Sequence, residues 1–539
     1  MPKSSAMEKQ TTCWKSVELS FYCQEQFCCP EDIEFFAIFT SPSGKIVKVP
    51  GFWNGGREWK IRYTSNQTGI HLFETDSQPY VKGLAGRTGQ CRFERKKNEQ
   101  NPLYRHGFPV VKDRKILYSD GKEFFWLGDT WWMGLCKRLD RKGFKILAKD
   151  RREKGFTVIQ IVAGLYPDMD WYDPRGKNEA GFPYSRDFKR LNPAYFKCAD
   201  WKIKYLCDVG IVPCIVGAWG YYIKWSGIEK MKRHWRNIIA RWSAYPVIWC
   251  IAGETIMPYY LSETRQADIE FQKKAWTEIA KYVKEIDPFG HPITTHPTNL
   301  GHEQLENPEL LDINMLQTGH GSHTSFDNTW SSIKKAKDHC PSKPVVIGEV
   351  NYEGIGEACR EEIQRICFWG SMLSGVSGYT YGANGIWQVN TEKKPYGPSP
   401  HGRSWGDTPW QVAYKLPGSH HVAVGKRILE KIGLYNLVPC SQKLELEGEK
   451  SCVFAAETGD GTIIIIYAGP PAFNSGIKKI AGLLPDHRYS LCFVDPKDGK
   501  TRKRFEIKTG SDGEWVFQTH YWRTVPVWQD WVLIIRRKT

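Results

Sequence analysis

The middle of the chain alternates short apolar runs with longer amphipathic stretches. The apolar runs predict eight strands, at residues 124–128, 157–162, 212–216, 247–251, 293–295, 311–315, 345–347 and 378–381. The stretches between them predict helices, at residues 138–154, 192–209, 229–244, 267–287 and 356–373. This order is typical of a parallel sheet, and eight strands complete a (β/α)₈ TIM barrel. An open, doubly wound sheet is the alternative, but no Gly-x-Gly-x-x-Gly turn follows the first run.

Both ends of the chain show a different pattern, in which apolar and polar residues alternate along short segments separated by turns. These segments lie at residues 17–21, 34–39, 59–63, 69–73, 452–456, 462–467, 489–494 and 531–535. Such alternation is typical of β-sandwiches. We therefore predict an α/β protein with three domains: an N-terminal β-sandwich and linker (1–100), a catalytic barrel (101–440) and a C-terminal β-sandwich (441–539).

Two of the predicted barrel strands end in the dipeptide Gly-Glu, at Gly253-Glu254 and at Gly348-Glu349. The C-terminal ends of barrel strands face the catalytic mouth, so the two carboxyl groups are expected to share one pocket. Glycoside hydrolysis needs such a pair, because one acid protonates the leaving oxygen while the other works on the opposite face of the sugar. We assign Glu254 as the acid/base and Glu349 as the nucleophile. The alternative is that either residue caps a helix or pairs with an arginine.

Other polar and aromatic residues follow the predicted strands and form a ring around the expected mouth, which includes Gln317 and Asn384. The residues expected to bind substrate are Asp129, Trp131, Trp132, Gln160, Trp219, His296, His320, Tyr352, Tyr381 and Trp387. Asp129 could bind sugar hydroxyls beside a stacking indole, or cap the next helix instead. A single histidine is more often a packing residue than a ligand. The long segment 390–410 is predicted to form a lid or a wall of the site.

Composition changes this picture only in detail. The chain has 539 residues, and its aromatic content of 14%, with 23 Trp, fits sugar stacking as well as ordinary cores. The formal charge of +16 allows an acidic partner, but no zinc-finger or RRM signature supports nucleic acid. His320 and His323 have no third ligand at a recognisable spacing, and His302-Glu303 does not extend to a zincin motif, so we expect neither a metal nor a cofactor.

The sixteen cysteines include no Cys-x-x-Cys pair, and several lie in apolar runs, as reduced thiols do in a reducing compartment. Residues 1–20 contain no signal-peptide core, and no apolar run approaches the length of a membrane span. A cytoplasmic protein without a membrane partner is therefore expected. The sequence makes no prediction of oligomeric state.

The chain resembles the apiosidase-like family of glycoside hydrolases. The resemblance rests on the segments 128–132, 155–160, 252–254, 347–349 and 352–354. It implies a (β/α)-barrel, and characterised members of the family remove sugars from complex pectic polysaccharides. The front β-domain looks like the small sandwich that often precedes this barrel. The tail is similar to a β-domain labelled collagen-binding in such proteins, a label that we do not extend to function here.

One residue departs from the wider clan of barrel glycosidases. In that clan Asn commonly precedes the acid/base Glu, whereas Gly253 stands there in this chain. The resulting hypothesis is an exo-acting, retaining glycoside hydrolase for pectic-type oligosaccharides, working without a cofactor. The alternatives are a catalytically inactive carbohydrate-binding protein and a polysaccharide lyase.

Overall fold

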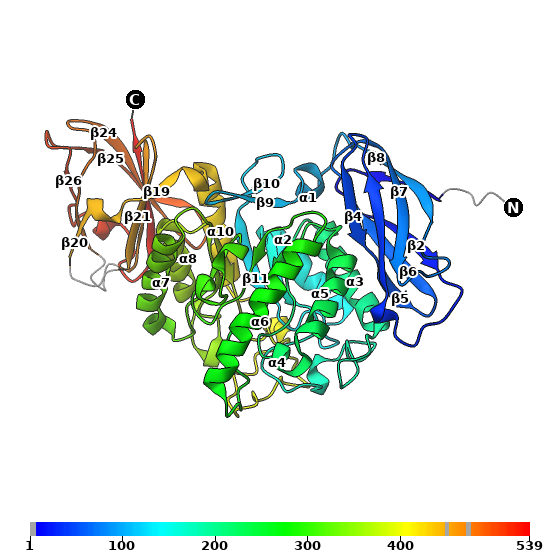
Figure 1. Cartoon of the computed structure of the whole chain (residues 1–539). Coiled ribbons are helices and arrows are strands. Elements are labelled where there is room, and N and C mark those ends of the chain that lie inside the picture. Colours follow the sequence, from blue (N-terminus) through cyan, green and yellow to red (C-terminus); the bar gives the residue numbers. More distant parts are fainter. Residues whose placement is uncertain (1–6, 448–451, 471–475, 539) are drawn as a thin grey trace.

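The computed structural model describes residues 7–447, 452–470 and 476–538. Figure 1 shows three parts side by side: the sheets of the N-terminal segment, a central barrel wrapped by helices, and the sheets of the C-terminal segment. The barrel therefore lies between two β-domains. Within the described ranges, no helix has the length and apolar character needed to cross a membrane.

The N-terminal domain consists of two sheets around one core. The strand order of the larger sheet is β1 (Met7–Thr12), β8 (Thr88–Glu94), β7 (Gly69–Gln78), β3 (Glu34–Thr40) and β4 (Ile46–Pro50). The order of the smaller sheet is β2 (Val17–Tyr22), β6 (Glu58–Tyr63) and β5 (Phe52–Gly55). Residues of β7 alternate between buried and exposed, so one face of the larger sheet packs inward and the other faces outward. The four strands predicted here are confirmed.

The barrel contains eight parallel strands, as predicted. Their order is β15 (Ile293–Thr294), β14 (Ile248–Cys250), β13 (Val212–Val216), β12 (Val158–Val162), β11 (Trp126–Thr130), β18 (Gly378–Tyr381), β17 (Val345–Glu349) and β16 (Asn314–Gln317). Hydrogen bonds join β15 to the residues directly before β16, where the barrel closes: Asp312 N donates to Ile293 O at 2.8 Å, and Thr294 Oγ1 donates to Ile313 O at 3.0 Å.

The barrel strands are near-continuous apolar runs because both of their faces are buried. Every residue of β11, β12, β13, β17 and β18 is buried. The helices are α1 (Pro102–Arg105), α2 (Arg141–Lys154), α3 (Pro193–Asp208), α4 (Tyr222–Ser226), α5 (Ile228–Trp242), α6 (Arg265–Ile286), α7 (Phe326–His339), α8 (Glu361–Leu373), α9 (Trp410–Ala413) and α10 (Gly418–Ile432). A hairpin of β9 (Pro109–Lys112) and β10 (Lys115–Tyr118) leads into the barrel.

The limits of helix α2 are set by its own residues. The Asp140 side chain accepts a hydrogen bond from Gly143 N and caps the first turn. Gly155 ends the helix with a φ of 94°, a conformation that favours glycine. These two residues fix where the helix between the first and second barrel strands begins and ends.

Two predicted strands are displaced from their observed positions. The first begins at Trp126 instead of residue 124, because Phe124 N bonds to Ile116 O and extends the preceding hairpin. The sixth begins at Asn314 instead of residue 311, because the chain before it turns through a 3-10 helix at Pro308–Leu310. Apolar side chains are buried in both places, so hydropathy alone does not separate strand from turn.

All five predicted helices are present, although the last begins only at Glu361, after a 3-10 turn at Ile355–Glu357. Helices α7 and α10 were not predicted. Most of the α7 sequence is polar, and only a few of its positions are buried against the barrel. A narrow apolar stripe of this kind gives a weak periodic signal.

The C-terminal domain again has two sheets. The larger has the order β19 (Leu437–Pro439), β21 (Val453–Thr458), β22 (Ile463–Ala468), β27 (Trp531–Arg537), β24 (Arg488–Val494) and β25 (Thr501–Lys508). The smaller has the order β20 (Leu444–Leu446), β23 (Ile477–Ile480) and β26 (Trp515–Val516). The four strands predicted here are confirmed. A buried ion pair between Arg365 of α8 and Asp530, with N to O distances of 2.7 and 2.8 Å, fixes this domain to the barrel.

Candidate active site

Glu254 and Glu349 line one cavity at the C-terminal end of the barrel strands. Glu349 is the last residue of β17, and Glu254 follows β14 with a φ of 42°. Gln317 connects them, because its Nε2 lies 3.0 Å from Glu254 Oε1 and 3.2 Å from Glu349 Oε1. The register between β16 and β17 skips Gly348 and sets Gln317 directly beside Glu349.

Besides Gln317, three side chains donate hydrogen bonds to Glu349. His320 Nε2 lies 2.7 Å from Oε1, His296 Nε2 lies 3.1 Å from Oε2, and the Tyr352 hydroxyl also donates to Oε2. The backbone N–H of Tyr352 donates to His320 Nδ1, which leaves the hydrogen of that ring on Nε2. Burial tends to raise the pKa of Glu349, but the hydrogen bonds from His296 and His320 outweigh it and hold this pKa well below its ordinary value.

The carboxyl of Glu254 has the opposite environment. Burial raises its pKa, and the negative charge of Glu349 raises it further. Hydrogen bonds from Gln317 and from Trp219 Nε1, 3.1 Å from Oε2, act against this shift without cancelling it. Two neighbouring carboxyls whose pKa values are pushed apart can serve as a proton donor and an ionised partner.

The glycines of the two Gly-Glu dipeptides are required by close packing. A Cβ atom on Gly253 would lie 2.2 Å from Cε3 of Trp219, and one on Gly348 would lie 2.4 Å from Cγ of Met315. The Trp219 indole therefore fills the space that a side chain at position 253 would need. This packing explains the departure from the clan pattern, and it supplies the hydrogen bond from Trp219 to Glu254.

The cavity has a volume of about 100 Å³ and largely aromatic walls. Its lining residues are Trp132, Pro167, Asp168, Trp219, Glu254, Tyr260, Gln317, His320, Glu349, Tyr352, Ile355, Trp387 and Trp405. Aromatic faces with a few convergent polar groups are typical of sites for small ligands and suit the apolar faces of a sugar ring. Among the residues the structure describes, no group of three or more His, Cys, Asp or Glu side chains could hold a metal ion.

The structure brings most of the expected residues to this cavity. Besides the two glutamates, the wall contains Trp132, Trp219, His320, Tyr352 and Trp387. His296 lies behind the wall, where it reaches Glu349.

Four expected binding residues lie elsewhere: Asp129, Trp131, Gln160 and Tyr381. Asp129 is fully buried and pairs with Arg151 of α2, 2.6 Å away, while Trp131 Nε1 donates to the same carboxylate at 2.8 Å. Gln160 Nε2 donates to Gly348 O at 2.8 Å, and the Tyr381 hydroxyl donates to Glu353. Asp129 and Tyr381 are register partners on β11 and β18, and Gln160 joins β12 to β17, so these side chains connect parts of the barrel.

Residues of four loops, after β12, β14, β17 and β18, line the cavity without having been expected to bind substrate. Asp168 and Tyr260 follow β12 and β14 at a distance, so no strand end or motif pointed to them. Trp405 belongs to the segment predicted to form a lid or wall, and it does line the cavity. Gln317 belonged to the predicted ring of polar residues, because it follows the sixth predicted strand.

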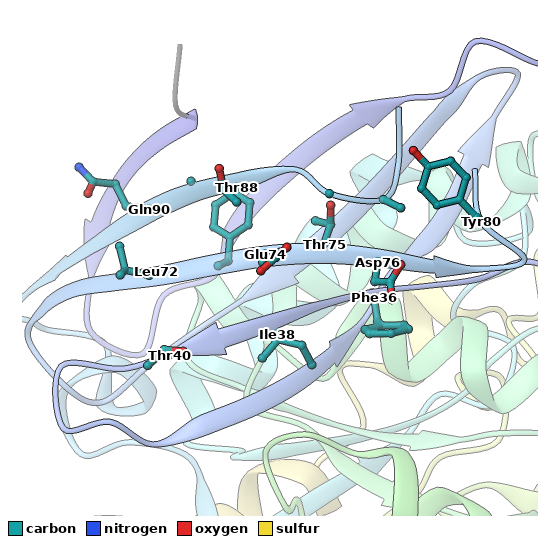
Figure 2. A pocket seen from close by; sticks show the side chains of 14 residues that line it. Phe36, Ile38, Thr40, Leu72, Glu74, Thr75, Asp76, Tyr80, Thr88 and Gln90 are labelled. Atoms are coloured by element: carbon teal, nitrogen blue, oxygen red, sulfur yellow. The ribbon is translucent and has the colours of Figure 1, made fainter. Parts of the chain in front are cut away.

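A second and larger hollow lies on the outer face of the N-terminal sheet (Figure 2). It has a volume of about 840 Å³, and its lining includes Phe36, Leu72, Glu74, Asp76 and Tyr80. Both carboxylates belong to β7 and are exposed to solvent. This hollow, hereafter the N-terminal groove, therefore does not provide the buried, paired carboxyls found in the barrel.

Comparison with known proteins agrees with this geometry. A family profile described as "Apiosidase-like, catalytic domain" matches residues 111–436, and a "Domain of unknown function (DUF5060)" matches residues 10–78. No curated protein matches this chain.

Solved structures show the same fold at low sequence identity. A Bacteroides vulgatus ATCC 8482 protein, provisionally described as a glycoside hydrolase, is 18% identical with a TM-score of 0.67, and the match covers 98% of this chain and 100% of that one. A glycoside hydrolase family 5 protein from the same organism is 21% identical with a TM-score of 0.65, over 82% and 95% of the two chains. The profile spans more than half of the sequence, and the chain belongs to the apiosidase-like family of glycoside hydrolases.

Proposed function

We propose that this glycosidase is a retaining, exo-acting enzyme for pectic-type oligosaccharides, with Glu349 as nucleophile and Glu254 as acid/base. The observation that carries the proposal is the Gln317 bridge. One nitrogen lies 3.0 Å from a Glu254 oxygen and 3.2 Å from a Glu349 oxygen, so these two oxygens are at most about 6.2 Å apart, which is below the ~6.5–9.5 Å carboxyl spacing of inverting glycosidases.

In the first step Glu254 gives its proton to the glycosidic oxygen as the bond to the anomeric carbon breaks. Ionised Glu349 attacks that carbon from the opposite face and forms a glycosyl ester. In the second step Glu254, now a carboxylate, takes a proton from water, and the hydroxide attacks the anomeric carbon and frees Glu349. The raised pKa of Glu254 and the lowered pKa of Glu349 suit the two residues to these starting states.

The shape of the cavity supports action at a chain end. Its volume of about 100 Å³ is small, and Trp387 and Trp405 stand in its wall. An internal segment of a polysaccharide would need an open cleft. The pectic substrate is proposed because the resemblance to the apiosidase-like family implies it. All sixteen cysteines belong to the described residues and are free thiols, which supports a reducing, cytoplasmic location.

A panel of aryl glycosides and pectic oligosaccharides tests the proposal. We expect release of single sugars, and NMR spectra taken during the first turnovers should show a product with the anomeric configuration of the substrate. A product of inverted configuration would contradict retention, and internal cleavage would contradict exo action. Unsaturated chain ends would indicate a lyase, and no product from any glycoside would indicate an inactive binding protein.

A further inference from the structure

A third carboxyl group, that of Asp168, lines the catalytic cavity and has no role in the two-step mechanism. Asp168 lies in the loop after β12, and only 4% of its surface is exposed. Its backbone has a φ of 60°, which is uncommon for a residue other than glycine. Such conformations cost free energy and persist where surrounding contacts fix them, often at ligand sites.

The segment after β18 fixes this residue in place. The Ser399 hydroxyl donates to Asp168 Oδ1, and Trp405 Nε1 donates to Ser399 Oγ at 3.0 Å. The Tyr396 hydroxyl lies 3.3 Å from Pro167 O and 3.4 Å from Asp168 O. Both the side chain and the backbone of Asp168 are therefore positioned by one loop that also supplies Trp405 to the cavity wall.

The second oxygen of this carboxyl is left without a donor. Asp168 Oδ2 is buried, and no hydrogen-bond partner reaches it from the described residues. Burial raises the pKa of Asp168 to about 6, and the nearby Ser399 hydroxyl and Trp405 indole act against this shift without cancelling it. Buried carboxyl oxygens are normally paired, and an unpaired one in the wall of a binding cavity is suited to a donor on the ligand.

Asp168, Tyr260 and the acid/base line the same cavity. The pKa of Tyr260 is raised first by burial and then by the charges of Glu254 and Asp168. A sugar held between Glu254 and Glu349 would occupy the cavity whose wall contains Asp168.

We propose that Asp168 is a specificity-determining residue whose free Oδ2 accepts a hydrogen bond from one hydroxyl group of the bound sugar. The inference rests on the proposed glycosidase function and deepens it. A site that hydrogen-bonds a substrate hydroxyl strongly rejects the analogue that lacks it, because the buried acceptor is then left unpaired. Recognition by Asp168 therefore selects among sugars that differ in that hydroxyl.

The test is a cycle of substrate and enzyme changes. kcat/KM is measured for the aryl glycoside that the wild type cleaves best and for each of its monodeoxy analogues, with wild type and Asp168→Asn. In the wild type we expect removal of one particular hydroxyl to lower kcat/KM by at least about 10²-fold. In Asp168→Asn the same removal should cost about tenfold or less, while losses at the other positions are equal in both enzymes.

Asp76→Asn in the N-terminal groove is the matched control, because it makes the same chemical change at an exposed carboxylate outside the barrel. It should keep the wild-type selectivity for the same hydroxyl. If the unfolding midpoint temperature of Asp168→Asn is lower than that of the wild type, Asp168→Ala is measured in the same way.

Two results would overturn the inference while the proposed function stands. One is a wild type in which no deoxygenation costs more than tenfold, and the other is an equal loss at every position in wild type and variant. If the wild type cleaves no glycoside, the proposed function fails, and this inference fails with it.

Discussion

The barrel cavity and the N-terminal groove both combine carboxylates with aromatic side chains, but only one of them is built for catalysis. The groove is larger, about 840 Å³ against about 100 Å³. Its Glu74 and Asp76 are two residues apart on one strand and face solvent (Figure 2). Glu254 follows β14 and Glu349 ends β17, and buried or partly buried donors surround them.

The difference teaches that the surroundings of a carboxyl matter more than the size of the hollow. Water and salt screen exposed charges, so neighbouring exposed carboxylates influence each other weakly. In the barrel, the two carboxyl groups are removed from bulk solvent, lie near each other and accept hydrogen bonds from neighbouring side chains. These move the pKa values of Glu254 and Glu349 in opposite directions.

The largest effect is expected for Glu349→Gln, which replaces the proposed nucleophile with a side chain of the same shape. kcat should fall by more than about 10⁴-fold, since no covalent intermediate can form. Calorimetric titration should still show binding of the released sugar. The matched control is Glu74→Gln in the N-terminal groove, where the same change should leave kcat unaltered. Wild-type turnover by Glu349→Gln would exclude its role as nucleophile.

Glu254→Gln should show a smaller loss that depends on the leaving group. With a poor leaving group, kcat/KM is expected to fall by about 10²–10⁴-fold, because no side chain protonates the departing oxygen. With a dinitrophenyl leaving group, which needs no proton, the first step should be nearly unchanged. Burst kinetics with both substrates measure this. Equal losses for the two leaving groups would contradict the acid/base assignment.

Gly253→Ala probes the packing that shapes this environment. The new Cβ would lie 2.2 Å from the Trp219 ring, so the indole must move and its hydrogen bond to Glu254 is lost. A hydrogen bond to a charged group contributes about 1.5–3 kcal/mol, which predicts a fall in kcat/KM of about 10–100-fold. Gly459→Ala is the control, because no atom lies within 4 Å of its added Cβ. Equal activity of the two variants would show that Trp219 adjusts without cost.

The pH profile of kcat/KM should reflect the two shifted groups. Glu349, with a lowered pKa, stays ionised until well below pH 4.5, so activity should persist into acid solution. Glu254, with a raised pKa, loses its proton only above pH 4.5, and beyond its pKa activity should fall about tenfold per pH unit. In Glu254→Gln, assayed with the dinitrophenyl substrate, this alkaline fall should disappear. If kcat/KM of this variant still falls in alkaline solution, the fall is caused by the ionisation of another group.

The smallest effect is expected for the double variant Glu74→Gln/Asp76→Asn. Both residues are exposed in the N-terminal groove, so kcat/KM for short glycosides should change by less than about twofold. Steady-state assays with an aryl glycoside measure this. A tenfold loss would show that the groove acts on the barrel and would break the comparison between the two regions.

Much of the fold could be predicted from the sequence, because buried parallel strands are near-continuous apolar runs. Most positions of the eight predicted runs are apolar, with polar exceptions such as Gln160, Asp312 and Asn314, and their order indicated helical crossovers. The meeting of Glu254 and Glu349 could be predicted for a related reason. A polar residue that ends such a run lies at the mouth of the barrel.

Which neighbouring residues reach the mouth was decided by the tertiary structure. Asp129 also lies near a strand end, yet it turns to Arg151 in the helix layer, while Asp168 reaches the cavity from a loop. The position of a residue in the sequence does not specify where its side chain points. That depends on the strand register, including the skip at Gly348, and on contacts with loops that are distant in the sequence. The residue pattern alone therefore determined the barrel and its two glutamates, and three-dimensional packing decided their pKa values and the walls around them.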